Sequence, residues 1–471
     1  MDELPCLTPT EPHGHARREP EPREPAWGHI RSACAIALHM HQPLIPAGGD
    51  DLARARVISN LRYMFEHPGE GDNHDAGAFH QCYRRSGEFI RTLMDEGLAP
   101  RLMLEYSGTL LHGLAEMGLS DVLDELRRVT QDARYRQAIE WLGAPWGHAV
   151  APSTPVEDYR RHVLAWRAHF AELFGADAVA RVRGFSPSEM ALPNQPDVAY
   201  EFVKTLRDAG YDWVLVQEHS VEQPGSRRLD RPHLPHRLVC TNSRGEVASI
   251  TAIIKTQGSD TKLVGQMQPY YEAKTLGRAE LAGRSVPQLV TQIADGENGG
   301  VMMNEFPSKY FEVVRLASGT ETPLLNVSEY LDELAALGVE SEQLPVLHPV
   351  HQGRIWERFE PGAGPERLSQ VVAELSAEGA GFHMEGGSWT NDISWVRGYA
   401  TLLNDMEKAS ALFHDKIERA GISPHDPRYQ NALFHLLCSQ TSCFRYWGQG
   451  RWTDYGRELC RRTREILNHD L

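Results

Sequence analysis

The fold is decided by residues 33–43, which read ACAIALHMHQP. An uninterrupted apolar run from Ala33 to Leu38 gives way there to a polar cluster with two histidines, a glutamine and a proline. A short continuous apolar run is typical of a strand buried on both faces, as the strands of parallel sheets are. The sequence therefore predicts a buried parallel strand with functional side chains at its carboxyl end.

The same pattern recurs further along the chain. Other short apolar stretches alternate with segments of helical period: the former lie at 101–105, 182–185, 213–216, 247–254 and 289–294, the latter at 83–97, 155–175 and 197–209. Strand, crossover helix and next strand in this order indicate a parallel α/β fold. Most of these strands end in polar or charged residues, which favours a barrel with its site at the carboxyl ends of the strands.

Three regions follow from changes in composition along the chain. Residues 1–28 are rich in proline, glutamate and arginine, and they predict a disordered tail. Residues 29–325 carry the alternation of strands and helices, which predicts the barrel. Long helical patterns dominate residues 326–471, which predicts a helical C-terminal domain.

The composition restricts the partners of the protein. Its 471 residues include 48 basic and 64 acidic side chains, for a formal charge of −16. This charge disfavours nucleic acids and anionic membranes, because both would be repelled. No apolar run approaches the roughly 20 residues of a membrane helix, no secretory pattern opens the chain, and the seven cysteines form no CxxC pair. We therefore expect a cytoplasmic protein with free thiols, and the oligomeric state stays open.

Two carboxylates follow predicted strands. Glu189 lies in RGFSPSEMALP, residues 183–193, and Asp295 opens DGENGG, residues 295–300. Each alone also fits a surface loop or a turn. Together, a pair of carboxylates at the ends of buried strands is what cleavage of a glycosidic bond requires.

Six blocks in sequence order resemble the motifs of glycoside hydrolase family 57. They are HMHQP (39–43), LEYSGTLL (104–111), APWGHAVAP (144–152), GFSPSEMALP (184–193), DGE (295–297) and MEGGSW (384–389). The resemblance extends from about residue 33 to about residue 460. The chain departs from the family pattern where Phe185-Ser186 precedes Pro-x-Glu in place of a tryptophan, and where Asn298-Gly299-Gly300 follows the DGE block.

The resemblance implies a (β/α)7 barrel, related to the TIM barrel but incomplete, followed by a helical region that completes the active site. It implies retaining hydrolysis or transfer at α-glucosidic bonds, with Glu189 as nucleophile and Asp295 as general acid and base. The expected substrate is an α-glucan or a maltooligosaccharide, with no cofactor or metal. An amylase or a 4-α-glucanotransferase is expected before a branching enzyme.

Further residues are candidates for binding sugar. Histidines and polar groups within the resembling blocks would contact sugar hydroxyls, and tryptophans would stack on sugar faces unless they pack in the core. The candidates are His41, Gln42, Glu105, His148, Trp213, Trp389 and Trp447. Glu297 is expected to be a partner of Asp295 without a catalytic role.

Two other functions remain open. His39-x-His41 at the end of the first strand also fits a metal-dependent amidohydrolase barrel, because residues two apart in a strand lie on the same side. Metal content and loss of activity on chelation would distinguish that enzyme. A non-catalytic glucan-binding relative is the other alternative, and incubation with maltooligosaccharides would identify it.

Overall fold

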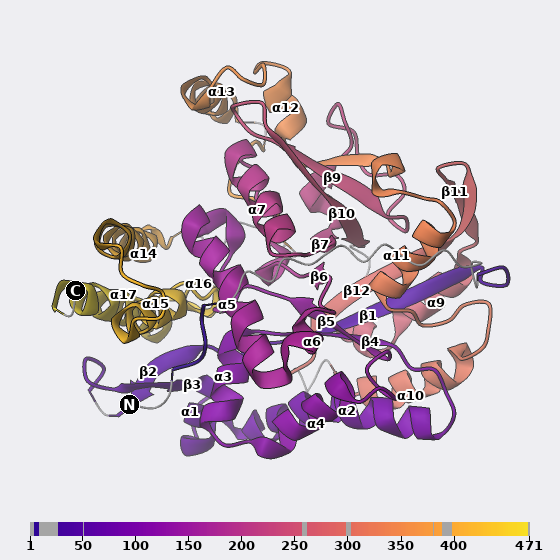
Figure 1. Cartoon of the computed structure of the whole chain (residues 1–471), viewed down its shortest axis with the longest axis horizontal. Helices are drawn as coiled ribbons and strands as arrows, with labels where there is room; N and C mark the ends of the chain where they lie inside the picture. The colour runs from indigo at the N-terminus through magenta and orange to yellow at the C-terminus, as the bar shows by residue number, and fades with distance from the viewer. Residues whose placement is uncertain are drawn as a thin grey trace.

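Seven parallel strands form the centre of the molecule in the computed structural model (Figure 1). In barrel order they are β1 (Ser32–Met40), β4 (Leu102–Tyr106), β5 (Ile139–Gly143), β6 (Gly184–Phe185), β7 (Trp213–Gln217), β10 (Val247–Lys255) and β12 (Arg284–Asp295). β12 pairs with β1 on one side and with β10 on the other, which closes the sheet. The expected (β/α)7 barrel is confirmed.

The structure describes residues 4–8, 27–49, 51–256, 261–297, 303–379, 381–388 and 398–469.

The first strand shows how the sequence builds the barrel. Ala33, Ala35 and Ala37 belong to one buried cluster together with interior residues of other strands, and Cys34, Ile36 and Leu38 belong to the cluster under the outer helices. Successive side chains of a strand point to opposite faces, so both faces of this strand are apolar because both are covered.

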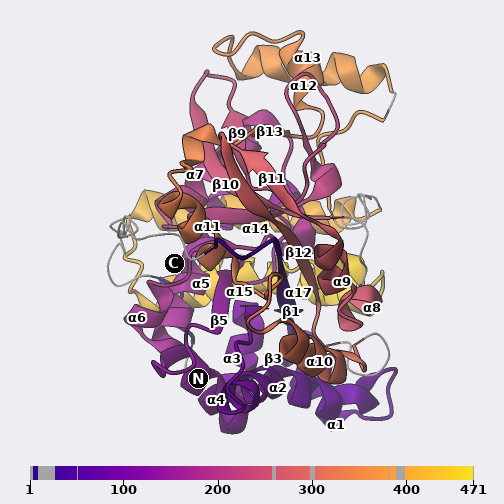
Figure 2. The ribbon, with the colours of Figure 1, turned by 90° about the vertical axis from the view of Figure 1, so that its right-hand side faces the viewer.

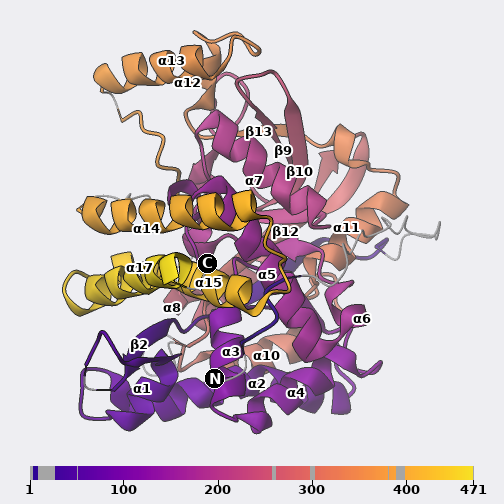
Figure 3. The same ribbon diagram turned by 60° about the vertical axis from the view of Figure 1, so that its left-hand side comes forward.

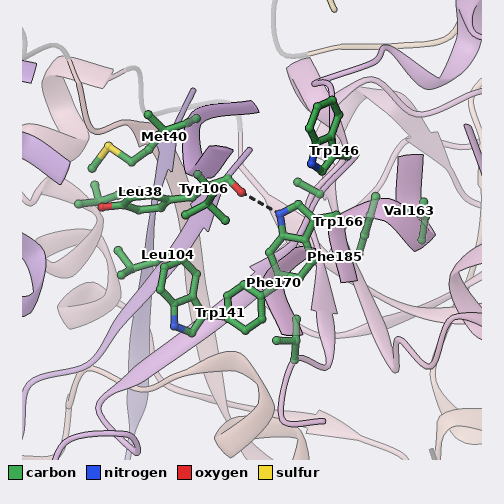
Figure 4. Packing of buried hydrophobic residues seen from close by; sticks show 14 of the residues in the cluster. Leu38, Met40, Leu104, Tyr106, Trp141, Trp146, Val163, Trp166, Phe170 and Phe185 are labelled. Atoms are coloured by element: carbon green, nitrogen blue, oxygen red, sulfur yellow. Dashed lines mark hydrogen bonds between the residues drawn. The ribbon is translucent and has the colours of Figure 1, made fainter. Parts of the chain in front are cut away.

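Helices cover the outside of the barrel. They are α2 (Ala76–Asp95), α3 (Gly108–Glu116), α4 (Ser120–Gln131), α5 (Val156–Phe174), α6 (Ala176–Val179), α7 (Pro196–Asp208), α8 (Thr261–Gly265), α9 (Gln268–Thr275) and α10 (Phe306–Ala317). Aromatic rings fill the space between β4, β5 and α5 (Figure 4). There Trp166 donates its indole N–H to the carbonyl of Tyr106 at 2.8 Å, and its ring stacks on Phe170.

The amino-terminal end of the barrel is closed by α11 (Val327–Ala336). Tyr330 of this helix packs against Trp27, and both belong to the cluster that fills the barrel interior. The first helix of the expected helical domain therefore packs within the barrel. The expected disordered tail is wrong for residues 4–8, because Leu7 is buried in the main core and Cys6 donates its backbone N–H to Glu172 of α5.

Further strands extend the barrel sheet beyond β10 and β12. β9 (His236–Thr241) pairs with β10, β13 (Val346–Pro349) pairs with β9 and β8 (Val221–Glu222), and β11 (Arg278–Leu281) pairs with β12 (Figures 1 and 2). β2 (Leu44–Gly48) and β3 (Arg56–Ser59) form a separate hairpin before α1 (Asn60–Glu66). α12 (Gln352–Trp356) and α13 (Pro365–Ala377) enclose a small core of their own.

The C-terminal helices α14 (Ala400–Phe413), α15 (Pro427–Ser439) and α17 (Arg451–His469) lie side by side (Figure 3). A π-helical turn, His414–Glu418, continues α14, and the short α16 (Cys443–Tyr446) follows α15. The segment between α15 and α16 contacts the barrel, where Thr441 and Ala149 form an isolated antiparallel β-bridge. Among the described residues, the structure contains no helix of the length and apolarity that a membrane span requires.

Candidate active site

Three polar residues lie in register at the carboxyl ends of neighbouring strands. His39 of β1 pairs with Asp295 of β12 on one side and with Glu105 of β4 on the other. The imidazole Nδ1 of His39 is hydrogen-bonded to Oε2 of Glu105. His39, near the carboxyl end of the first strand, therefore lies between Asp295 and Glu105 at the barrel mouth.

His39 carries a positive charge at neutral pH. Burial lowers its pKa, but the charge of Glu105 and their hydrogen bond outweigh burial, and with Asp295 and Glu297 they raise the pKa to about 10. The side chain of Glu105 is almost fully buried, and its Oε1 has no hydrogen-bond partner among the described residues. The pair is thus a buried ion pair with one free acceptor at the mouth.

Asp295 is the exposed last residue of a strand whose preceding residues are buried. Gly296 follows it, and a Cβ there would lie 2.2 Å from Cε of Met40, so a larger residue would displace this buried side chain. This turn directs Glu297 inward, where its Oε1 accepts hydrogen bonds from the backbone of His41 at 2.6 Å and from Tyr83 at 2.9 Å. Burial and, to a smaller extent, the charge of Asp295 raise the pKa of Glu297 to about 8.

Glu189 lies in the turn Ser188–Met190, directly after β6. Its φ is 58° and that of Met190 is 50°, a left-handed conformation that costs a side-chain-bearing residue about 1–3 kcal/mol. Such strain is maintained only where the surrounding structure imposes it. The carboxylate of Glu189 is 15 % exposed, and its Oε1 lies 3.9 Å from Nδ1 of His148.

Two neutral histidines stack beside this carboxylate. The ring centroids of His41 and His148 are 4.0 Å apart. Burial and, to a smaller extent, the neighbouring imidazoles hold the pKa of each ring well below its usual range. Nδ1 of His41 lies 2.8 Å from Oγ of Ser107 and its Nε2 lies 3.1 Å from Sγ of Cys443. Nδ1 of His148 lies 2.8 Å from Oγ of Ser442, while its buried Nε2 has no partner among the described residues.

The other binding candidates separate into distinct positions. Gln42 is buried, and its side-chain oxygen accepts a hydrogen bond from Nδ2 of Asn60, the first residue of α1, at 2.8 Å. Trp389 lies outside the described residues. Trp447 is 44 % exposed, and its backbone N–H is bonded to the carbonyl of Cys443, so it follows the mouth residues by one helical turn.

Trp213 does not lie at the site. It is the first residue of β7, fully buried, and its indole donates to Oγ of Ser328 in α11 at 3.0 Å. Its ring fills the space beside Gly184, where a Cβ would lie 2.2 Å from it. The prediction of a sugar platform at Trp213 is wrong, because the amino-terminal end of the barrel is filled by core packing.

Sequence reasoning missed the small residues that hold the histidines. Ser107 stands two positions after Glu105 in a quoted motif, so its place after β4 could have identified it. Ser442 and Cys443 lie some 300 to 400 positions from their partners and show no periodic signal. The contacts exist only because the C-terminal helices pack on the barrel.

The residues present do not fit the metal site of an amidohydrolase. That site would need His39 and His41 on one ion, but His39 is paired with Glu105 and both ring nitrogens of His41 are hydrogen-bonded. Within the described ranges, no group of three or more potential ligands is arranged to hold a metal ion.

A closed barrel with carboxylates and histidines around the carboxyl ends of its strands defines a barrel enzyme with its site at that face. The chain belongs to glycosyl hydrolase family 57, whose sequence profile matches residues 35–311. Members of this family are retaining glycosidases and transglycosylases that act on α-glucans. The predicted family is thereby confirmed, and five of the six motifs lie within the matched residues.

Solved structures share the fold. The 4-α-glucanotransferase of Thermococcus litoralis is 19 % identical, with a TM-score of 0.58 over 94 % of this chain and 60 % of that one. The family 57 branching enzyme of Pyrococcus horikoshii is 12 % identical, with a TM-score of 0.56 over 92 % of this chain and 88 % of that one. The branching enzyme of Thermococcus kodakaraensis, in complex with glucose, is also 12 % identical, with a TM-score of 0.54 over 94 % and 89 %. This chain thus spans less than two thirds of the glucanotransferase. No curated protein matches it by sequence.

Proposed function

We propose that the protein is a retaining glycoside hydrolase or transglycosylase acting on α-glucosidic bonds of α-glucans or maltooligosaccharides. One observation carries the proposal: in a family 57 barrel, Glu189 follows β6 and Asp295 ends β12, three strands apart along the shorter path around the sheet. Two carboxylates from opposite sides of one mouth can act on the two faces of a glycosidic bond.

In this mechanism Glu189 is the nucleophile and Asp295 the general acid and base. The carboxylate of Glu189 attacks the anomeric carbon while the glycosidic bond breaks, and Asp295 gives its proton to the departing oxygen. Asp295, now a carboxylate, takes a proton from the acceptor hydroxyl, whose oxygen displaces Glu189 from the anomeric carbon. Two displacements restore the original configuration of the sugar.

The neutral histidines suit the binding of the reacting sugar. A neutral imidazole both donates and accepts hydrogen bonds, as sugar hydroxyls do. Nε2 of His148 and Oε1 of Glu105 are buried without a partner among the described residues, and a bound sugar hydroxyl would satisfy each. We assign Trp447 to a sugar face further from the cleaved bond, since it is exposed next to the mouth.

The nature of the acceptor decides the activity. Water gives hydrolysis of the amylase type and a sugar hydroxyl gives glucan transfer; we place both before branching. Of the residues 326–471 predicted as a helical domain, the proposal assigns the completion of the barrel site to the C-terminal helices, because Ser442 and Cys443 contact the two histidines, whereas α11 closes the opposite end of the barrel.

Chromatography of the products from maltoheptaose and amylose tests the proposal. Shorter products alone indicate hydrolysis, longer chains indicate transfer, and new α-1,6 linkages indicate branching. Glu189→Gln should lower kcat at least about 10³-fold, and Asp295→Asn should lower it about 10²–10⁴-fold. Asp208→Asn, at an exposed carboxylate of α7, is the matched control.

Two further measurements separate the roles. Asp295→Asn should lose far less activity on an aryl maltoside, because a nitrophenolate leaves without a proton. Proton NMR should show the α-anomer as first product. A β-anomer, or full activity in Glu189→Gln, would overturn the mechanism. A wild-type protein that binds maltooligosaccharides without altering them would instead be the non-catalytic relative.

A further inference from the structure

Four consecutive residues that follow α15, the last of which begins α16, lie against the barrel mouth: Gln440, Thr441, Ser442 and Cys443, called here the 440–443 segment. Each is at most 2 % exposed. The backbone N–H of Ser442 donates to the carbonyl of His148 at 3.1 Å, in addition to the contact between the hydroxyl of Ser442 and the ring of His148. The segment therefore holds both the backbone and the side chain of an active-site histidine.

Gln440 anchors this segment to α5. Its Oε1 lies 3.0 Å from Nε2 of His162, and its Nε2 donates to Oδ2 of Asp158 at 2.6 Å. Nδ1 of His162 accepts the backbone N–H of Gly147 at 3.0 Å, so the proton of this imidazole sits on Nε2 and points at Gln440. Every polar atom of the Gln440 amide is thus used in one orientation.

Asp158 continues the chain of hydrogen bonds to the C-terminal helices. The carboxylate is fully buried, and its Oδ1 lies 2.8 Å from Nε2 of His414. Burial raises its pKa, but hydrogen bonds from His414, Ser410 and Gln440 outweigh burial, and the pKa stays below its usual range. A buried polar network with its members satisfied fixes one arrangement of the elements that it joins.

His148 needs such external support. Its φ is 56°, a left-handed conformation that is unfavourable for a residue with a side chain. Gly147, the preceding residue, is bonded to His162, and Ala149, the following residue, is bridged to Thr441. The network therefore holds the backbone on both sides of the strained residue.

We propose that the 440–443 segment is the positioning device of the sugar-binding histidines, with Ser442 as the positioning residue of His148 and the amide of Gln440 as its anchor. The proposal rests on the proposed function, in which His148 meets the reacting sugar. It makes the helical bundle part of the catalytic geometry, since the histidine loop alone does not hold its own conformation.

The test compares Ser442→Ala with Ser439→Ala. Ser439 is equally buried three positions earlier, where its hydroxyl donates to the carbonyl of Leu436 at 2.7 Å. Ser442→Ala should lower kcat/KM on maltoheptaose about tenfold or more, Ser439→Ala should change it less than about twofold, and Ser442→Thr, which keeps the hydroxyl, should restore most of the loss. The ¹⁵N resonance of His148 Nδ1, assigned by its absence in His148→Gln, should shift in Ser442→Ala only.

Equal loss of activity in both alanine variants, or no restoration by threonine, would overturn the proposal, because a merely structural role predicts both. An unshifted His148 resonance in Ser442→Ala would overturn it as well. If the wild-type protein acts on no α-glucan while the His148 resonance still depends on Ser442, the proposed function fails and the positioning role stands.

Discussion

The buried pair of His39 and Glu105 gives the sharpest test of the electrostatics at the barrel mouth. The substitution Glu105→Gln keeps the shape of the side chain and removes its charge. The imidazolium of His39 then loses the partner that raises its pKa to about 10. We expect His39 to become neutral at pH 7, because burial alone favours the uncharged ring.

The size of the effect follows from the pKa. A value of about 10 in place of 6.5 corresponds to about 5 kcal/mol, since each tenfold change in proton affinity is about 1.4 kcal/mol. Removal of one partner of a buried ion pair typically costs about 3–5 kcal/mol. Because the folded-state pKa is raised, this stabilisation is fully present below pH 6.5 and is lost as the pH rises through 10.

Urea denaturation between pH 6.5 and pH 9.5 measures this stabilisation. Glu105→Gln should be about 3–5 kcal/mol less stable than the wild type at pH 6.5, and the difference should shrink towards pH 9.5. A double-mutant cycle with His39→Gln isolates the coupling. Glu140→Gln is the control: it removes another buried carboxylate, on β5, which is bonded to Ser328 and not to a histidine.

Titration by ¹⁵N NMR observes His39 directly. The wild type and Glu140→Gln should keep His39 protonated beyond pH 8, and Glu105→Gln should not. A wild-type His39 that titrates near pH 6.5, or a stability difference that does not depend on pH, would refute the reasoning.

Three other predictions concern stability and binding. Glu297→Gln should be about 2 kcal/mol more stable than the wild type above pH 8 and no more stable near pH 4.5, because a raised carboxyl pKa costs stability as the pH rises from 4.5 through about 8. Urea denaturation at both pH values measures this difference, and equal stability above pH 8 would contradict the prediction. Trp447→Ala should raise KM for glucans about 3- to 10-fold with an unchanged melting temperature. Trp213→Ala, at a buried position, should instead cost about 3–5 kcal/mol of stability. The reverse pattern would make Trp213 the sugar-binding residue and Trp447 the core residue. Leu7→Ala should cost about 2–5 kcal/mol, since the side chain is 1 % exposed, and unchanged stability would show that residues 4–8 do not contribute.

The strands and their ends were accessible from the sequence. The apolar run Ala33 to Leu38 and the later stretches predicted buried parallel strands, and His39, Glu105 and Asp295 were found at strand ends because the carboxyl ends of parallel strands share one edge. The turn after β6 that carries Glu189 was also found from its position after an apolar run. These predictions rest on the local periodicity of apolar residues. That periodicity is a property of the sequence and does not depend on which tertiary contacts form.

The predictions for Trp213 and Trp447 show the limit of that reasoning. Trp213 and Trp447 have the same chemistry, and only the closed barrel decides that one fills the core and the other is exposed. β9 is preceded by a proline-rich stretch that does not indicate a strand, and it becomes one by pairing with β10.

The sequence by itself therefore determined the barrel, the carboxylates at its rim and the family. Only the tertiary structure decided how these groups act together. The charge of His39 depends on Glu105 from another strand, and the conformation of His148 depends on Ser442 from the distant C-terminal helices. Periodicity and motifs are properties of neighbouring residues, whereas pKa values and strained backbone conformations depend on what burial brings into contact.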